Sequence, residues 1–237
     1  MTLDFIGGVI LIAAVIVNIG VFTNALGVSQ ATRIGFVAIG GIWTGMQLSL
    51  YAAGAYQSPA VQDFPLVGPM VVLPPVIVGI TAILSGRVRA TLLAVPMEAL
   101  VGLNAMRVFG AFFVLLAAVD RLSGPFPYFA GWGDVITGLA AIALAMQVVR
   151  GSANPTTIFR WNVFGALDLI TAVTLGTLSS EGFVAQVFDG NPGSTAVQHM
   201  PWLLIPTVLV PFYLITHGII FAQLQQRRAA PVPAAIA

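Results

Sequence analysis

Long uninterrupted runs of apolar residues dominate the chain, and short polar stretches separate them. A helix of about 20 apolar residues crosses a hydrocarbon core of about 30 Å. Seven runs reach that length, at residues 4–26, 34–56, 65–85, 96–119, 127–149, 161–178 and 201–224. Because the runs are continuous rather than alternating, they favour helices over the strands of a membrane barrel. The pattern predicts an all-α polytopic membrane protein, with one seven-helix bundle over residues 1–228 and a disordered Ala/Pro-rich tail over 229–237.

Prolines and aromatic residues indicate where these helices bend and end. Internal prolines predict kinks in the third and seventh helices, with freed carbonyls that could face a cavity: Pro74, Pro75, Pro206 and Pro211. Three aromatic residues stand close to predicted helix ends, where interfacial aromatics are common: Tyr128, Trp161 and Trp202.

Arginines cluster in alternate connections, and this distribution predicts the orientation. Seven fall on one side of the predicted membrane: Arg33, Arg87, Arg89, Arg150, Arg160, Arg227 and Arg228. The other side holds only Arg121, together with most of the acids. Since basic residues in short loops stay in the cytoplasm, we expect the N-terminus outside, the C-terminus in the cytoplasm, and the long 179–200 connection facing outward.

Composition removes several classes of protein. A hydrophobic share of 58% and a charged share of 7% exclude a water-soluble globule, and a net charge of +1 gives no field for nucleic acid. The chain contains no cysteine and no lysine, so thiol chemistry and a retinal Schiff base are excluded. His199 and His217 are roughly 27 Å apart at helical rise, too far to share a haem. We therefore expect no cofactor and no metal.

Four ionisable residues lie deep within the predicted spans, away from their ends: Arg107, Asp134, Asp168 and His217. Each would cost about 2.5 to 3.5 kcal/mol facing lipid, so each is expected to face the bundle interior. By helical rise, Arg107, Asp168 and His217 share a depth of roughly 12 to 16 Å above the cytoplasmic ends of their helices. Asn104 shares a helix face with Arg107 and joins them as a candidate.

Two similar motifs contain the aspartates, "GWGDVITGL" from Gly131 and "GALDLITAV" from Gly165. Glycines and alanines at helical spacing accompany each acid, and such small residues let membrane helices approach closely. The aspartates are thus predicted on packing faces. Since the two helices run antiparallel, we expect Asp134 toward the outer leaflet and Asp168 near the midplane, with Arg107 between them.

The minimal pairing is Arg107 with Asp168, which cancels two charges that lipid tolerates poorly alone. His217 would accept from or donate to this pair, and Asp134 would reach Arg107 from the outer side. One hypothesis is that the cluster binds or relays a proton, an ion or a small polar solute. The alternative is a non-catalytic subunit or accessory protein whose buried charges are structural. An enzymatic role is not favoured, and the expected partners are lipids and a homo-oligomer or larger membrane complex.

The C-terminal half, from Arg107 onward, carries a recognisable set of motifs. They are "FAGWGDVITGLAA", "RWNVFGALDLITAVTLG" and a last helix "PWLLIPTVLVPFYLITH" that contains His217. This set resembles uncharacterised bacterial seven-helix inner-membrane proteins. The resemblance implies a multi-pass protein of the bacterial inner membrane and implies no activity.

Overall fold

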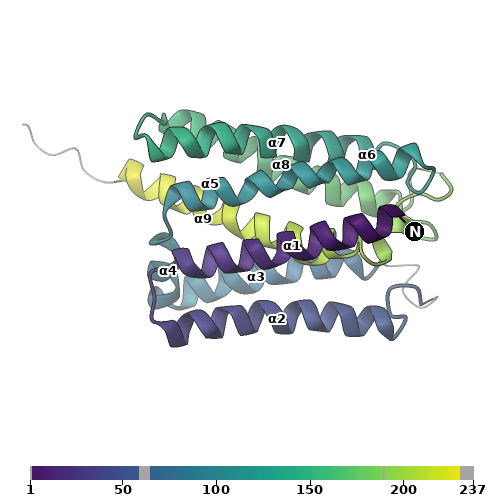
Figure 1. Ribbon diagram of the computed structural model, residues 1–237, viewed down its shortest axis with the longest axis horizontal. Helices are drawn as coiled ribbons and strands as arrows, with labels where there is room; N and C mark the ends of the chain where they lie inside the picture. The colour runs from purple at the N-terminus through teal and green to yellow at the C-terminus, as the bar shows by residue number, and fades with distance from the viewer. Residues whose placement is uncertain (1, 59–64, 189, 230–237) are drawn as a thin grey trace, which may run out of the picture.

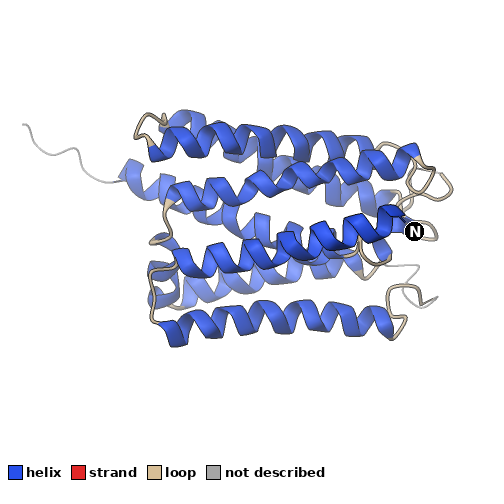
Figure 2. Cartoon of the chain, in the orientation of Figure 1, coloured by secondary structure: helices blue, strands red, loops and turns tan. Residues whose placement is uncertain are grey.

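The computed structural model describes residues 2–58, 65–188 and 190–229, and in these ranges it consists of helices joined by loops, with no strand (Figure 2). Seven helices are long and apolar enough to cross a membrane: Thr2–Ala25, Gln30–Ala52, Val67–Leu84, Met97–Ala118, Phe126–Val149, Pro155–Leu178 and Ile205–Arg228. The predicted all-α class and number of spans are therefore confirmed. The tail predicted to be disordered lies outside the described residues, apart from Ala229, which ends the last helix.

Capping residues explain where the observed helices depart from the predicted spans. Helix α8 (Pro155–Leu178) begins six residues before the predicted limit, because Asn154 accepts from Thr156 N at 2.8 Å and proline fits the first helical position. A short helix, α4 (Gly86–Leu93), lies between the third and fourth predicted spans, and Ser85 caps it. Helix α2 (Gln30–Ala52) stops before Tyr56. Local polar groups thus set helix ends that hydrophobicity alone misplaces.

The helices lie roughly parallel or antiparallel in one elongated bundle (Figure 1). Helices α7 (Phe126–Val149) and α8 form one edge and α2 the other, with α1 (Thr2–Ala25), α3 (Val67–Leu84) and α9 (Val210–Ala229) between them. The first residues of α1 and the last of α9 lie at opposite ends, as an odd number of spans requires. We call these the Asp4 end and the Arg227 end.

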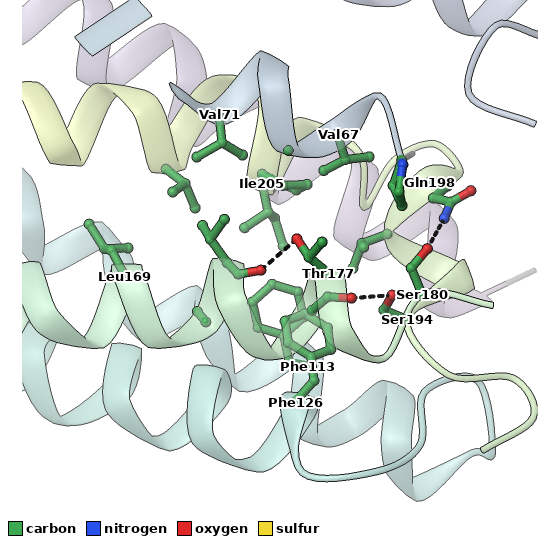
Figure 3. Close-up of a pocket in the computed structure, with 18 of the residues that line it drawn as sticks. Val67, Val71, Phe113, Phe126, Leu169, Thr177, Ser180, Ser194, Gln198 and Ile205 are labelled. Carbon is green, nitrogen blue, oxygen red and sulfur yellow. Dashed lines mark hydrogen bonds between the residues drawn. The ribbon is translucent and has the colours of Figure 1, made fainter. Parts of the chain in front are cut away.

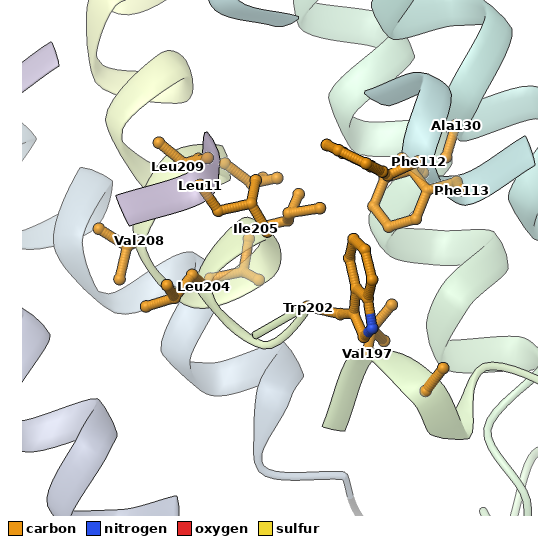
Figure 4. Packing of buried hydrophobic residues seen from close by; sticks show 14 of the residues in the cluster. Leu11, Phe112, Phe113, Ala130, Val197, Trp202, Leu204, Ile205, Val208 and Leu209 are labelled. Carbon is orange, nitrogen blue, oxygen red and sulfur yellow. The ribbon is translucent and has the colours of Figure 1, made fainter. Parts of the chain in front are cut away.

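Two apolar clusters fill the bundle and leave a polar layer between them. The cluster toward the Asp4 end is built around residues such as Leu11, Phe112 and Trp202 (Figure 4). The cluster toward the Arg227 end contains Leu100 and Ile220. The fourth, fifth and last spans each pass from one cluster to the other, and their ionisable residues fall at the crossing. Apolar packing on both sides therefore isolates the charges.

Trp202 was predicted at the membrane interface, and that prediction is wrong. Its side chain is fully buried, and its indole Nε1 donates to Asp4 Oδ1 at 2.7 Å. A Cβ at Gly7 would overlap the indole ring, so this glycine makes the space that the ring fills. Tyr128, by contrast, is 52% exposed, as an interfacial residue would be.

The last span begins irregularly, as its prolines predict. A π-helical segment, η4 (Ile205–Leu209), includes Pro206 and precedes α9. Pro211 lacks the N–H that would bond to the carbonyl of Thr207, four residues earlier. The indole of Trp43 supplies the missing donor, 2.7 Å from Thr207 O. This freed carbonyl therefore attaches α2 to the last span and does not line a cavity.

Candidate functional site

The fourth span changes helix type where its arginine lies. It consists of α5 (Met97–Leu103), a 3₁₀ segment η2 (Asn104–Gly110) and α6 (Ala111–Ala118). With three residues per turn, a 3₁₀ helix stacks positions i and i+3 in one row. Asn104, Arg107 and Gly110 form such a row, and they are the buried residues of the segment. The local winding thus turns Arg107 inward.

Arg107 joins three other helices through its guanidinium group. Its Nε donates to Asp134 Oδ1 on α7 at 2.7 Å, and its Nη2 donates to Asp168 Oδ2 on α8 at 2.5 Å. Its Nη1 lies 3.0 Å from both the carbonyl oxygen of Gly165 and Nε2 of His217 on α9. The arginine side chain has no exposed surface. Four hydrogen bonds therefore hold one buried cation at the centre of the bundle.

The hydrogen bonds fix the tautomer of His217. A guanidinium group can only donate, so Nε2 of His217 must accept from Arg107 and carries no proton. The other ring nitrogen, Nδ1, lies 2.7 Å from Oδ1 of Asn162, which accepts its N–H. Asn162 Nδ2 in turn donates to the carbonyl of His217 at 3.1 Å, which settles the orientation of the amide. His217 is therefore a neutral acceptor toward Arg107, and it does not carry the positive charge of a proton relay.

Glycines of the first motif, together with Gly110 of η2, let the acids approach. A Cβ on Gly133 would overlap the carboxylate of Asp168, and one on Gly110 would overlap Asp134. A Cβ on Gly131 would stand 2.6 Å from Val114 Cγ2 and 3.1 Å from the carbonyl of Gly110. The "GWGD" sequence thus brings α7 against η2 and leaves room for an acid from α8.

Gly165 does the same for the histidine in the second motif. A Cβ there would lie 2.7 Å from Cε1 of His217. Because Gly165 has no side chain, its carbonyl also stays open to Nη1 of Arg107. Each motif therefore combines an acid with a glycine that makes space for a different helix.

The structure brings four of the five predicted site residues together, namely Arg107, Asp134, Asp168 and His217. Asn104 is not among them: its Nδ2 donates to the carbonyl of Leu100 at 2.9 Å and to Oγ1 of Thr216 at 3.3 Å. Asn104 shares the buried row with Arg107, but its side chain bonds to Leu100 and Thr216 instead of to the cluster. It therefore links η2 to α9.

The predicted separation of the acids into two levels is wrong, since both bind one guanidinium group. Asp134 lies eight residues after the start of α7, and Asp168 ten residues before the end of α8. At about 1.5 Å per residue these depths are about 12 and 15 Å from the Asp4 end, which nearly coincide. The predicted depths differ because they were counted from the limits of the hydrophobic runs, and these limits do not coincide with the ends of the helices.

Sequence reasoning missed three residues around the cluster. Asn162 orients His217, and the ring of Tyr213 lies 5.9 Å from the guanidinium carbon. Trp161 was predicted to be interfacial but is buried, with its indole donating to the carbonyl of Thr137 at 3.1 Å and its ring 5.4 Å from that of His217. A signal was present for Asn162, which precedes Gly165 by one helical turn on the same face.

A pocket leads from the Asp4 end toward the cluster (Figure 3). It is a narrow cavity of about 50 Å³ between α3, α8 and the start of the last span. Three polar residues line its outer part, Ser180, Ser194 and Gln198, and Gln198 Nε2 donates to Ser180 Oγ at 3.1 Å. Its walls are apolar, and Asp134 is the acid that lines it. One carboxylate of the cluster therefore lines a pocket whose polar residues lie toward the Asp4 end.

The cluster contains more acid than base. Asp134 and Asp168, with side chains 9% and 8% exposed, share the single cation Arg107, and His217 is neutral. Were both carboxylates ionised, the layer would carry a net charge of −1 in a medium that disfavours it. Within the described residues, no three His, Asp or Glu side chains are grouped to hold a metal ion. A proton or another monovalent cation is the charge that balances the site.

The His217 tautomer can be tested by nitrogen NMR. In a His199→Asn variant labelled with ¹⁵N-histidine, the remaining histidine is expected to show a protonated Nδ1 and an unprotonated Nε2. Replacing Asn162 with alanine removes the acceptor and is expected to mix the tautomers. A protonated Nε2 in the His199→Asn protein would contradict the assigned hydrogen bonds.

Fold and site together define a polytopic helical membrane protein whose bundle encloses an Arg/Asp/Asp/His cluster. Residues 64–225 match the family described as Domain of unknown function (DUF8737), and the chain belongs to this family. No curated protein and no solved structure matches the chain. The matched residues contain all four members of the cluster.

Proposed function

We propose that this protein binds a proton at the Asp134–Asp168 pair and exchanges it with the aqueous phase at the Asp4 end. The observation that carries the proposal is the count of two buried carboxylates against one guanidinium. Two acids that close to one cation titrate as a coupled pair, because the second charge is uncompensated. One proton shared by the pair makes the layer neutral.

The pocket at the Asp4 end supplies the route for this proton. Asp134 lines the pocket, and Ser180, Ser194 and Gln198 lie near its outer part. A cavity of about 50 Å³ exceeds the roughly 10 to 15 Å³ that one water molecule needs. Asp134 is thus the residue that accepts the proton from the outside, and Arg107 couples Asp134 to Asp168.

The arginine distribution supports one orientation for the exchange. Of the eight arginines outside the cluster, seven fall at the Arg227 end, and Arg121 lies at the Asp4 end. By the positive-inside tendency, the Arg227 end is cytoplasmic and the pocket opens to the outside. In this proposal the protein is a multi-pass component of a bacterial inner membrane, and protons reach the cluster from the outer face.

A purely structural role is the second candidate, and Arg107 itself favours it. The guanidinium contacts α7, α8 and α9, and such a buried hub can fix helix register without any chemistry. A structural hub does not require its protonation to respond to the outside pH. The titration of the pair therefore separates the two candidates.

Infrared spectroscopy of the protein in lipid nanodiscs tests the proposal. The wild type is expected to show the C=O stretch of a protonated carboxylic acid, which disappears reversibly as the pH rises. Asp134→Asn and Asp168→Asn are each expected to abolish this band, because one carboxylate facing one guanidinium forms a neutral pair with no proton to lose.

Asp4→Asn is the matched control, because Asp4 pairs with Arg121 in a one-to-one ion pair at the bundle end. This variant should keep the titrating band. A band that does not respond to pH, or one that survives in both Asn variants of the cluster, would contradict the proposal and favour the structural role.

A further inference from the structure

Asp168 faces a second environment, distinct from the pocket that Asp134 lines. It lies in a groove of about 480 Å³ on the outer surface of α7 and α8. Four aromatic residues line this groove: Tyr128, Phe129, Trp132 and Phe164. Each is 46% to 61% exposed, so the groove opens to the lipid-facing surface of a membrane-embedded bundle. Asp168 is the acid among its lining residues.

One oxygen of the Asp168 carboxylate is hydrogen-bonded to Arg107, and the other has no hydrogen-bond donor among the described residues. Oδ2 accepts from Arg107 Nη2, whereas no hydrogen bond reaches Oδ1 from any described residue. The Asp168 side chain is only 8% exposed, and Gly133 packs directly against its Oδ1. A buried, half-satisfied carboxylate beside aromatic faces is a site for a positive charge.

We propose that this groove binds a hydrophobic organic monovalent cation that enters from the lipid. The charge of such a cation pairs with Asp168 Oδ1, while its apolar groups contact Trp132 and Phe164. Lateral opening selects molecules that partition into the bilayer. The cluster accepts one added positive charge, which selects a monovalent cation over a neutral or anionic molecule of the same shape.

The proton and the organic cation balance the same charge and therefore exclude each other; this step rests on the proposed function. Asp168 is paired with Arg107 from η2, and Arg107 in turn contacts Asp134 from α7 and His217 and Tyr213 from α9. Of these groups, Arg107 is positive, Asp134 shares the proton, and neutral His217 already accepts from Arg107. When the cation enters, the shared proton leaves to water through the Asp134 pocket, and the net charge of the layer stays at zero.

Equilibrium dialysis of tetraphenylphosphonium against the full chain in nanodiscs tests this inference, with empty nanodiscs as the baseline. At alkaline pH we expect saturable binding, weakened by about tenfold or more in Asp168→Asn. Asp134→Asn is expected to weaken it too, although this residue does not line the groove, because the layer then has no excess negative charge. Trp132→Leu is expected to weaken it by about two- to fivefold.

Two controls match these variants. Ile170→Ala alters an exposed apolar residue of α8 outside the groove, and Asp4→Asn removes an acid outside the cluster; both should bind as the wild type does. Tetraphenylborate, of the same shape and opposite charge, should show no saturable binding. Equal binding of tetraphenylborate would overturn the inference, and so would unchanged affinity in both Asp168→Asn and Trp132→Leu. The aromatic residues of the groove would then be ordinary interfacial residues.

The outcomes also separate this inference from the proposed function. Saturable binding that requires Asp168 but does not weaken at acid pH would support the cation site in the groove. It would contradict competition between the proton and the cation. A pH-dependent infrared band without saturable tetraphenylphosphonium binding keeps the proton site and overturns the cation site.

Discussion

Arg107→Ala is expected to lower the free energy of unfolding by about 3 to 5 kcal/mol. The substitution leaves Asp134 and Asp168 next to each other with no cation, and it removes the donor from Nε2 of His217. Because their side chains are only 9% and 8% exposed, neither acid is well solvated in place of the lost cation. Reversible unfolding of the purified protein in mixed micelles, followed by circular dichroism, measures the change.

Arg121→Ala is the matched control for this prediction. Arg121 also bonds to an aspartate at 2.6 Å, but both side chains of that pair are about one-third exposed. Solvent screens such a pair, so the expected loss is at most about 1 kcal/mol. Equal losses in the two variants would show that burial of the cluster does not govern its contribution.

A triple variant tests whether charge imbalance is the cause. Arg107→Met with Asp134→Asn and Asp168→Asn keeps similar volumes and removes all three charges. It is expected to recover much of the stability that Arg107→Ala loses, because a buried ion cluster can be replaced by neutral groups at little net cost. A triple variant less stable than Arg107→Ala would instead identify the hydrogen-bond geometry as the main contribution.

Gly138→Ala is expected to destabilise the bundle by about 3 kcal/mol and to disrupt the site. A Cβ at this position would stand 2.7 Å from the backbone nitrogen of Val108 and 3.1 Å from the carbonyl oxygen of Ala105. Backbone atoms cannot rotate away as a side chain can, so η2 must move away from α7. Since Ala105 and Val108 flank Arg107, the guanidinium would move with them.

Gly218→Ala provides the comparison, because this glycine adjoins His217 in α9 and a Cβ there would meet nothing within 4 Å. Alanine forms helix better than glycine, so this variant is expected to be neutral or more stable by up to about 1 kcal/mol. Unfolding measurements should place the two variants on opposite sides of the wild type. If Gly138→Ala unfolds as the wild type does, close contact between α7 and η2 is not required.

Much of the fold follows from local sequence, and the errors have local causes. Each span had enough apolar residues to be recognised, and the prolines predicted the irregular start of the last helix. The limits of α8 were misplaced because a polar cap and a proline, rather than hydrophobicity, begin that helix. Trp202 was misplaced because nearness to a helix end does not say whether a ring faces lipid or fits against Gly7.

The candidate site was partly accessible to the same reasoning. Because a charge facing lipid is costly, the sequence pointed to Arg107, Asp134, Asp168 and His217. In the structure, the other three all contact the guanidinium of Arg107. Helix spacing alone could not exclude Asn104, because the row that it shares with Arg107 arises from a 3₁₀ segment whose residues bond to different helices. Nor could spacing give the proton position on His217, which depends on Asn162.

The sequence by itself determined the class of protein, the number of spans and the residues that lipid cannot accept, because these depend on the hydropathy of each segment. Only the tertiary structure decided that both aspartates share one guanidinium, that one of them faces a pocket and the other a lateral groove, and that the histidine is a neutral acceptor. Those features depend on the rotation and approach of helices distant in the chain. Contacts with the glycines of neighbouring helices set how closely the helices approach, to within a few ångströms. The periodicity of the sequence does not predict distances this small.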